Sequence, residues 1–295
     1  MRENDAVGEL CEAFEVSRSG YYRWRGREGG QREGENKRLL REIESVHGDR
    51  HMRAYGSPRM TVELNERGHA CSENRVARLM RGQGVRARGK RPFRPKTTRQ
   101  DPEGRFAPNL LAEASQPLDP GRALGSDITY VATREGWLYL AVVLDLGSRM
   151  VLGWQTGESL GTDLVLGAID RSVARRRGPS LLRDAEDPII FHSDRGCQYS
   201  SDACRRRLDE LGIVQSMSAT GNCYDNAICE SFFATLKTEA FPEDCVFDTK
   251  RQARLAIFDY LETFYNSRRR HSSLGYLCPE DYEKNHFQGL FQNLN

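Results

Sequence analysis

The chain has 295 residues, of which 38% are hydrophobic and 29% are charged, a composition typical of globular proteins. Its longest apolar run, residues 137–144, is too short to cross a membrane as a helix. The N-terminus has no apolar signal-peptide core, so we expect a cytoplasmic protein with no membrane partner. The eight cysteines form no C-x-x-C pair, which favours reduced thiols over a disulfide framework.

The net charge of +2 conceals a strong asymmetry along the chain. Residues 1–100 hold 23 Lys and Arg against 14 Asp and Glu, whereas residues 101–295 hold 21 against 28. A basic N-terminal part favours a polyanionic partner. An acidic C-terminal part is unusual in a nucleic-acid-binding protein, unless some of its carboxylates hold metal ions.

Residues 1–50 form the first predicted unit, which is helical and resembles a helix-turn-helix. Over about residues 6–25, apolar side chains recur at the spacing of an amphipathic helix, and a serine-containing turn follows. A second helix is predicted over about residues 35–47. We expect the aromatic residues of this unit to belong to a core rather than to stack on bases, because large aromatic side chains are mostly buried; they are Tyr21, Tyr22 and Trp24.

Residues 51–100 form the second predicted unit, a basic helix-turn-helix segment. One helix is predicted over about residues 59–67, and Ser72 can cap the next. Between residues 75 and 99 there are ten basic residues and no acidic one. A basic run on a recognition helix favours contact with DNA phosphates, which gives affinity without sequence choice. The side chains that we expect to contact DNA are Arg75, Arg78, Arg81, Arg86, Arg88, Lys90 and Arg91.

A change of pattern after residue 100 predicts a linker and then a mixed α/β domain. Residues 101–122 carry four of the eleven prolines, which indicates a linker. Residues 123–285 begin with three closely spaced strands, which predict an antiparallel meander, and continue with alternating helices and strands. They end in a long helix, whose last arginines (residues 268–270) favour DNA contact slightly over interaction with the helix dipole. Residues 286–295 are predicted to be a tail.

Three acids stand at positions that favour chemistry. Asp127 lies on the first predicted strand, and Asp194 lies where the fourth strand ends, the usual place for a site in an open α/β sheet. Glu230 lies on a helix, on a face other than the one that packs on the core. Each acid alone is more typical of a turn or a surface, so only the three together favour a catalytic site. We expect Asp145, which precedes a turn, to be structural or to support the three acids without binding the metal.

Three carboxylates that converge repel one another unless cations lie between them. Oxygen ligands suit magnesium or manganese, and two such ions about 3.5–4 Å apart can hold both reacting oxygens of a phosphodiester. The set therefore predicts in-line phosphoryl transfer. His192 shares a strand face with Asp194, and Asn226 shares the helix face of Glu230. We expect both to support the site without binding the metal.

Several stretches then match one known family. They are Ser126–Val131, His192–Ser200, Ser216–Ala227, Glu230–Glu239 and Tyr265–Tyr276. Together they resemble the second-frame (OrfB-type) product of IS-three-type insertion-sequence transposases, in the DDE transposase and retroviral integrase superfamily. The 35 residues between Asp194 and Glu230 match the D-D-35-E spacing of that superfamily. Each motif alone is weak, but the set is specific.

The resemblance implies a ribonuclease-H-like integrase core in which Asp127, Asp194 and Glu230 are the catalytic residues and hold two Mg²⁺ ions, for which Mn²⁺ can substitute. The implied activity is metal-dependent cleavage of transposon ends, followed by strand transfer of the freed 3′-hydroxyl. Lys237 matches a position where the superfamily places a basic residue against the transposon end. The implied partners are double-stranded DNA, further copies of the chain on that DNA, and an upstream-frame protein, separate or fused. The implied location is the bacterial cytoplasm, at the nucleoid.

Two other functions stay open at this stage. A ribonuclease-H-like nuclease without strand transfer fits the acids, although Lys237 and the helix-turn-helix segment argue against it. A non-catalytic DNA-binding regulator of transposition fits the basic N-terminal part, although the complete set of acids argues against it.

Overall fold

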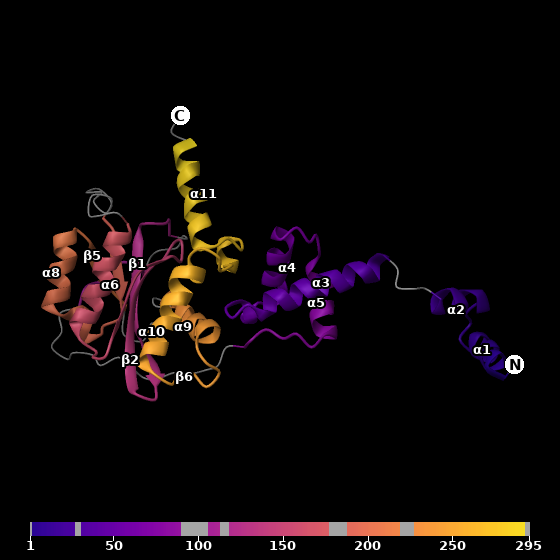
Figure 1. Cartoon of the computed structure of the whole chain (residues 1–295). Coiled ribbons are helices and arrows are strands. Elements are labelled where there is room, and N and C mark those ends of the chain that lie inside the picture. The colour runs from indigo at the N-terminus through magenta and orange to yellow at the C-terminus, as the bar shows by residue number, and fades with distance from the viewer. Residues whose placement is uncertain are drawn as a thin grey trace.

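The structure is a computed structural model that describes residues 2–26, 31–89, 106–112, 118–176, 188–218 and 227–292. Helices form its N-terminal part, and a mixed sheet with helices on both faces forms the rest (Figure 1). Among the described helices, none has the length and apolar character that a membrane crossing needs. The N-terminal helices are α1 (Arg2–Ala13), α2 (Arg18–Arg25), α3 (Gln31–Gly48), the 3-10 turn η1 (Met52–Ala54), α4 (Ser57–Glu66) and α5 (Glu73–Gly82).

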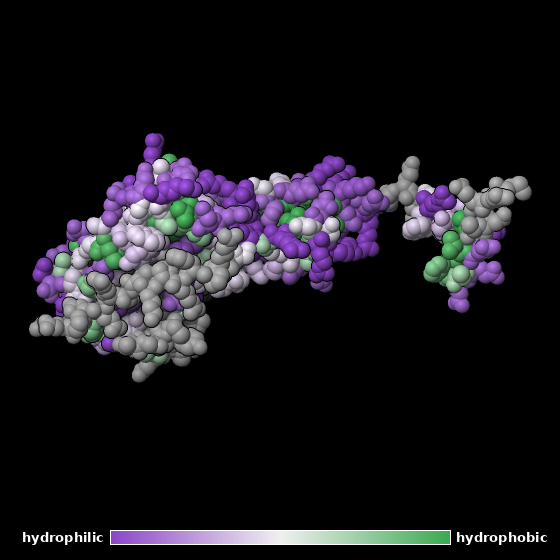
Figure 2. All heavy atoms as spheres, turned by 90° about the horizontal axis from the view of Figure 1, so that it is seen from below, coloured by the Kyte–Doolittle hydropathy of each residue, from purple (hydrophilic) through white to green (hydrophobic). Residues whose placement is uncertain are grey.

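Helices α1 and α2 are largely exposed. Trp24 is 70% exposed and Phe14 is 74% exposed, and α2 has no buried residue. Figure 2 shows hydrophobic atoms at the surface of this separate N-terminal part. The core position expected for Tyr22 and Trp24 is therefore wrong. The two rings contact Tyr21 instead, with centroid distances of 5.4 and 6.0 Å, and α1, which packs on α2, leaves both rings exposed.

Helices α3, α4 and α5 pack on one another and form one unit, which we call the helical module. Ile43, Leu64 and Val76 are fully buried within it. The first helix of the predicted pair, α4, ends near Gly68, whose φ of +84° suits glycine. The division that the sequence suggested at residue 50 thus falls inside a packed unit.

A six-stranded sheet forms the centre of the second part, with strand order β3-β2-β1-β4-β5 and β6 beside β1. β1 and β2 pair antiparallel through ten residue pairs, and β3 extends this meander, as the sequence predicted. β4 and β5 run parallel to β1. The strands are β1 (Ala123–Thr133), β2 (Gly136–Asp145), β3 (Val151–Gly157), β4 (Ile190–Ser193), β5 (Val214–Met217) and β6 (Val246–Phe247).

Helices cover both faces of this sheet, and each face has its own hydrophobic cluster. On one face, α6, α7 and α8 pack against β4 and its neighbours. On the other face, α9 and α10 pack between the sheet and the helical module. The helices of this part are α6 (Thr162–Arg175), α7 (Cys197–Ser200), α8 (Asp202–Leu211), α9 (Ala227–Ala240), α10 (Lys250–Tyr260) and α11 (Pro279–Gln292).

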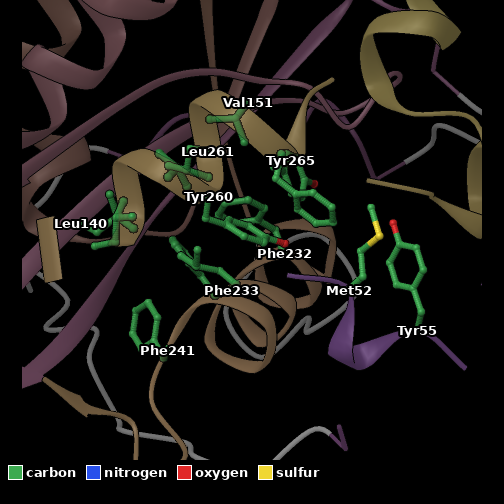
Figure 3. Packing of buried hydrophobic residues seen from close by; sticks show 14 of the residues in the cluster. Met52, Tyr55, Leu140, Val151, Phe232, Phe233, Phe241, Tyr260, Leu261 and Tyr265 are labelled. Carbon is green, nitrogen blue, oxygen red and sulfur yellow. The ribbon is translucent and has the colours of Figure 1, made fainter. Parts of the chain in front are cut away.

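The helical module and the sheet domain share one of these clusters. Figure 3 shows Phe232 of α9 among the buried rings, with Met52 and Tyr55 of the module on one side of the group. Polar contacts join the same parts, since His51 Nε2 lies 2.9 Å from Asp259 Oδ2. Burial of this shared apolar surface holds the module against α9 and α10.

The C-terminal part differs from the predicted long helix and tail. α10 ends at Tyr260, and a π-helical stretch, Leu261–Tyr265, continues it. The expected tail at residues 286–295 is wrong, because α11 extends to Gln292. Glu283 anchors this helix by accepting hydrogen bonds from Ser148 Oγ and from Arg176.

Part of the expected linker lies along the sheet domain. Pro108 O accepts a hydrogen bond from Met217 N, and Leu110 N donates to Ser216 Oγ, both on β5. The Arg195 guanidinium lies 4.9 Å from the centre of the Phe106 ring. Residues 106–112 therefore cover the edge of the sheet beside β5, although proline-rich composition predicted only a connection.

Candidate active site

The sheet brings Asp127 and Asp194 side by side. β1 and β4 pair in parallel up to Ser126 and Ser193, and each aspartate is the next residue of its strand. Since neighbouring strands lie about 4.8 Å apart, in-register positions place both carboxylates at one point of the sheet. Both side chains are only partly buried. Solvent and ligands can therefore reach them.

Backbone donors orient one oxygen of each aspartate. Asp127 Oδ1 accepts from Ile128 N at 2.7 Å, and Asp194 Oδ1 accepts from Gly196 N at 3.0 Å. Each contact leaves the second oxygen of its carboxylate to face away from that backbone donor. The contacts also limit the rotation of both side chains, which prepares them to hold a cation.

A buried tyrosine lies beneath these two acids. Tyr199 is 1% exposed, and its hydroxyl lies 3.0 Å from Ser126 Oγ. Burial raises the pKa of Tyr199 well above its usual value, and the charges of Asp127 and Asp194 raise it further. The phenol therefore stays neutral. Sequence reasoning missed this residue, although it lies inside the stretch His192–Ser200.

Helix α9 reaches the same region through a close contact with β1. Gly125 shares a strand face with Asp127, and a Cβ at Gly125 would lie only 3.0 Å from Cys229 Sγ. Burial raises the pKa of the Cys229 thiol well above its usual value, and Asp127, Asp194 and Glu230 all raise it further. The thiol is thus within electrostatic range of all three acids. Sequence reasoning missed Cys229, because no motif distinguishes a packing cysteine from its neighbours.

Glu230 follows Cys229 on α9 and is exposed. Within the ranges that the structure describes, no three His, Cys, Asp or Glu side chains are close enough together to hold one metal ion. The three acids therefore share one region without forming a closed cage. Their donor chemistry still fits magnesium or manganese, since all three supply carboxylate oxygens, which hard cations prefer.

Lys237 lies two turns after Glu230 on α9 and is partly buried. Burial lowers its pKa, while Cys245 and the Asp127 carboxylate act in the opposite direction. The ammonium group is therefore within electrostatic range of the candidate site. This arrangement agrees with a basic group that contacts DNA beside the acids.

The residues expected to support the site differ in what the structure shows of them. His192 is 1% exposed, and its Nδ1 lies 2.9 Å from Ser216 Oγ, so it links β4 to β5 next to Asp194. Asn226 lies outside the described residues. Asp145 is fully buried and accepts hydrogen bonds from Gly121, Gly147, Ser148 and Arg176, which confirms its structural role.

The arginines expected to contact DNA fall into two groups. Arg75 binds Glu35 and Asn36 of α3, and Arg88 donates to the carbonyls of Phe241 and Pro242. Their donors are thus engaged within the chain. Lys90 and Arg91 lie outside the described residues. The remaining three, which we call the exposed arginine set, are Arg78, Arg81 and Arg86.

Replacing the exposed arginine set by glutamine should flatten the salt dependence of DNA binding. Each lost phosphate contact should reduce the slope of log K against log salt by about 0.9. Fluorescence anisotropy with a labelled duplex measures this slope. The matched control replaces Arg134, Arg171 and Arg206, which are exposed on the sheet domain. Equal slopes for the two triple variants would contradict a DNA-contacting role for the set.

The C-terminal arginines correct another expectation. Arg269 is 3% exposed and binds Glu239 through Nε at 2.7 Å and Nη2 at 2.8 Å. The DNA contact expected of Arg269 is therefore wrong. Arg270 forms ion pairs with Glu63 and Glu66 of the helical module. Both side chains therefore stabilise the fold, because each pairs with a carboxylate of another element. The sequence does not show which elements meet there.

Gly125→Ala should reduce cleavage more than DNA binding. The new methyl group would lie 2.5 Å from Leu146 Cδ2 and 3.0 Å from Cys229 Sγ, so the Leu146 side chain and Cys229 must give way, and we expect α9 to shift away from β1. A displacement of Glu230 by about 1 Å can cost roughly 10²-fold in rate. Gly82→Ala is the control, since a Cβ there meets nothing within 4 Å. Unchanged cleavage by the Gly125 variant would show that this contact does not position Glu230.

Known protein families match the helical module and the sheet domain separately. Family models described as "Integrase core domain" match residues 117–223 and 211–279, and one described as "HTH-like domain" matches residues 34–93. This last range spans α3, α4 and α5, the helices of the helical module.

Two curated relatives cover almost the whole chain. The "Insertion element IS600 uncharacterized 31 kDa protein" of Shigella sonnei is 38% identical over 95% of this chain and 99% of its own length. "Transposase InsF for insertion sequence IS3A" of Escherichia coli is 37% identical over 94% of each chain.

Two solved structures are similar at low identity. The catalytic core domain of BIV integrase is 18% identical with a TM-score of 0.39, and covers 58% of this chain and 99% of its own. The HTLV-2 integrase catalytic core domain in complex with magnesium is 16% identical with a TM-score of 0.36, and covers 53% of this chain and 93% of its own. The identity to the insertion-sequence relatives extends along nearly the full length of the chain. The chain therefore belongs to the IS3-type insertion-sequence transposases, with an HTH-like domain before an integrase core.

Proposed function

We propose that this protein is a DNA transposase that cleaves the ends of its element and joins the freed 3′-hydroxyl to target DNA. One observation carries the proposal. The parallel register of β1 and β4 places Asp127 beside Asp194, and α9, which carries Glu230 and Lys237, packs on β1 at Gly125. The family relationship supports the same activity.

The carboxylates of Asp127, Asp194 and Glu230 would hold two Mg²⁺ ions, for which Mn²⁺ can substitute. When bound, these ions supply Lewis-acid stabilisation of the attacking and leaving oxygens of a phosphodiester. The chain contributes position: backbone N–H groups fix one oxygen of each aspartate. Contact between Cys229 and Gly125 sets the distance of Glu230 from the sheet. Lys237 would hold a DNA phosphate beside the acids.

A strand-transfer assay tests this function. The substrate is a labelled duplex that carries the end of the element, mixed with an unlabelled target duplex. With Mg²⁺ we expect a nicked end and then a joined product, and with a chelator we expect neither. Cleavage without joining would indicate a nuclease, and binding without cleavage under all metal conditions would indicate a regulator. Either result would overturn the proposal.

We further propose that the protein acts on DNA as a homo-oligomer in the bacterial cytoplasm, at the nucleoid, and that an upstream-frame protein joins it. Exposed apolar side chains on α1 and α2 support the last point, since such surfaces are commonly covered by a partner. Light scattering with and without element-end DNA measures the oligomeric state. A single copy per DNA end, even in synaptic mixtures, would contradict the oligomer.

A further inference from the structure

A cavity of about 420 Å³ lies between the helical module and α9. Its walls come from parts that are distant in sequence: Arg59 on α4, the first turns of α9, and the loop at residues 269–273. Asp127, Asp194 and Glu230 are not among the residues that line it. The cavity is therefore separate from the candidate active site, although both use α9.

Positive charge is in excess in this cavity. Among the described residues, its lining includes Arg59, Arg88, Arg149 and Arg269, against the one acid Glu239. Glu239 is already engaged, because Arg269 donates two hydrogen bonds to it at 2.7 and 2.8 Å. The closest approach of Arg59 to the same carboxylate is 3.8 Å, and Arg88 binds only uncharged carbonyls. In the described chain, the positive charges of Arg59, Arg88 and Arg149 are therefore not fully neutralised by carboxylates.

Of these three side chains, Arg149 has the fewest partners in the described chain and would gain most from a bound anion. It lies in the turn before β3 with a φ of +64°, which non-glycine residues rarely adopt and which tends to be retained at functional sites. In the described part of the chain, its guanidinium forms no ion pair and no hydrogen bond. It is nevertheless partly buried, and burial lowers its pKa.

The other lining groups favour an anion as well. Burial, together with the positive charges of Arg269, Arg59 and Arg149, lowers the pKa of His271 to about 2. The imidazole therefore stays neutral, and its low pKa is a sign of the positive potential in the cavity. Ser231 and Thr235 present hydroxyls from α9 and form no hydrogen bond with another described residue. The first turn of α9 also lines the cavity, and the positive end of a helix dipole favours anions.

We propose that this cavity is a second phosphate site, in which Arg149, Arg59 and the hydroxyls of α9 hold a backbone phosphate of DNA away from the three carboxylates. The choice of DNA rests on the proposed function. It is supported by the position of the cavity between the HTH-like module and the helix that carries Glu230. A phosphate held there would fix α9 and the module on one DNA strand at the same time.

Arg149→Gln tests the site without any use of catalysis. Anisotropy of a labelled duplex of arbitrary sequence is measured over a salt series, with a chelator present so that metal-held DNA contributes nothing. We expect the slope of log K against log salt to fall by about one, and Arg149→Lys to restore it by keeping the charge. Arg206→Gln is the control, because this exposed arginine lies on α8, on the opposite face of the sheet from α9.

Thr235→Glu is a second, independent variant that places a negative charge in the cavity. It should weaken DNA binding and lower the salt slope like Arg149→Gln, while its own melting temperature stays level or rises. A parallel measurement adds inorganic phosphate at constant ionic strength. The wild-type protein should gain thermal stability from phosphate, and both variants should lose that gain.

The outcomes separate the possibilities. An unchanged slope and an unchanged phosphate effect in both variants would overturn the site. Loss of the phosphate effect with an unchanged slope would overturn DNA as the occupant, and would indicate a free phosphate-bearing molecule. Because no arm needs cleavage, a failed strand-transfer assay leaves this test intact, and a failed phosphate site leaves the transposase assignment intact.

Discussion

Asp194→Asn is expected to abolish cleavage of the element end while DNA binding persists. The substitution keeps the oxygen that accepts from Gly196 N, so the local fold is retained, but it removes the charge that a divalent cation needs. Metal-ion catalysis supplies several kcal/mol to phosphoryl transfer, so the loss should reach roughly 10³-fold or more. Gel-based cleavage of a labelled end measures the rate, and anisotropy measures the binding.

Asp209→Asn is the matched control for this variant, because it removes one exposed carboxylate from α8, on the other face of the sheet. It should cleave like the wild-type protein. Asp127→Asn and Glu230→Gln should behave like Asp194→Asn if the three acids act as one metal site. Wild-type cleavage by any of the three would remove that residue from the site.

Arg269→Ala is expected to destabilise the fold more than any of the active-site substitutions. Arg269 and Glu239 are 3% and 5% exposed, and Tyr260 also donates to Glu239 at 2.7 Å. Burial alone lowers the pKa of Arg269, but the contact with Glu239 outweighs it and the pKa ends above its usual value. Removing Arg269 breaks a buried ion pair and leaves the Glu239 carboxylate with Tyr260 and, at 3.8 Å, Arg59. Such a loss costs about 3–5 kcal/mol.

The neighbouring residue provides the control for this prediction. The side chain of Arg268 is 51% exposed and lies 3.7 Å from Asp49, so Arg268→Ala should change the free energy of unfolding by less than about 1 kcal/mol. Urea unfolding at neutral pH measures both variants. Equal effects for the two arginines would show that the pair with Glu239 does not stabilise the junction between α9 and the residues after the π-helical stretch.

Local sequence patterns predicted most of the elements because their causes are local. Alternating apolar residues and short turns predicted the β1–β2–β3 meander. Ser72 stands at the N-cap of α5 as expected, but its side chain forms no capping hydrogen bond there. The positions of Asp127, Asp194 and Glu230 on predicted elements, together with the family resemblance, made them the candidate site. The sequence could not show that β4 pairs in parallel with β1, because pairing between distant strands depends on the whole sheet.

The errors arose where a residue's partner is distant in sequence. Tyr22 and Trp24 are aromatic residues of the kind that usually belong to a core, but the packing of α2 leaves them 44% and 70% exposed. Arg269 stands in a basic run typical of a DNA-binding surface, but the Glu239 carboxylate of another element binds it and it is buried. Arg75 and Arg88 also bind groups of other elements, and their contact with DNA stays a prediction.

By itself, the sequence determined the family, the mixed α/β class and the three acids, because motif spacing and hydrophobic period are properties of the chain alone. Only the tertiary structure decided which arginines are structural, how α9 approaches β1 at Gly125, and that a cationic cavity forms between α9 and the helical module. The physical reason is that burial and charge pairing depend on contacts between distant segments, such as His51 and Asp259, which are 208 residues apart, and no local pattern encodes those contacts.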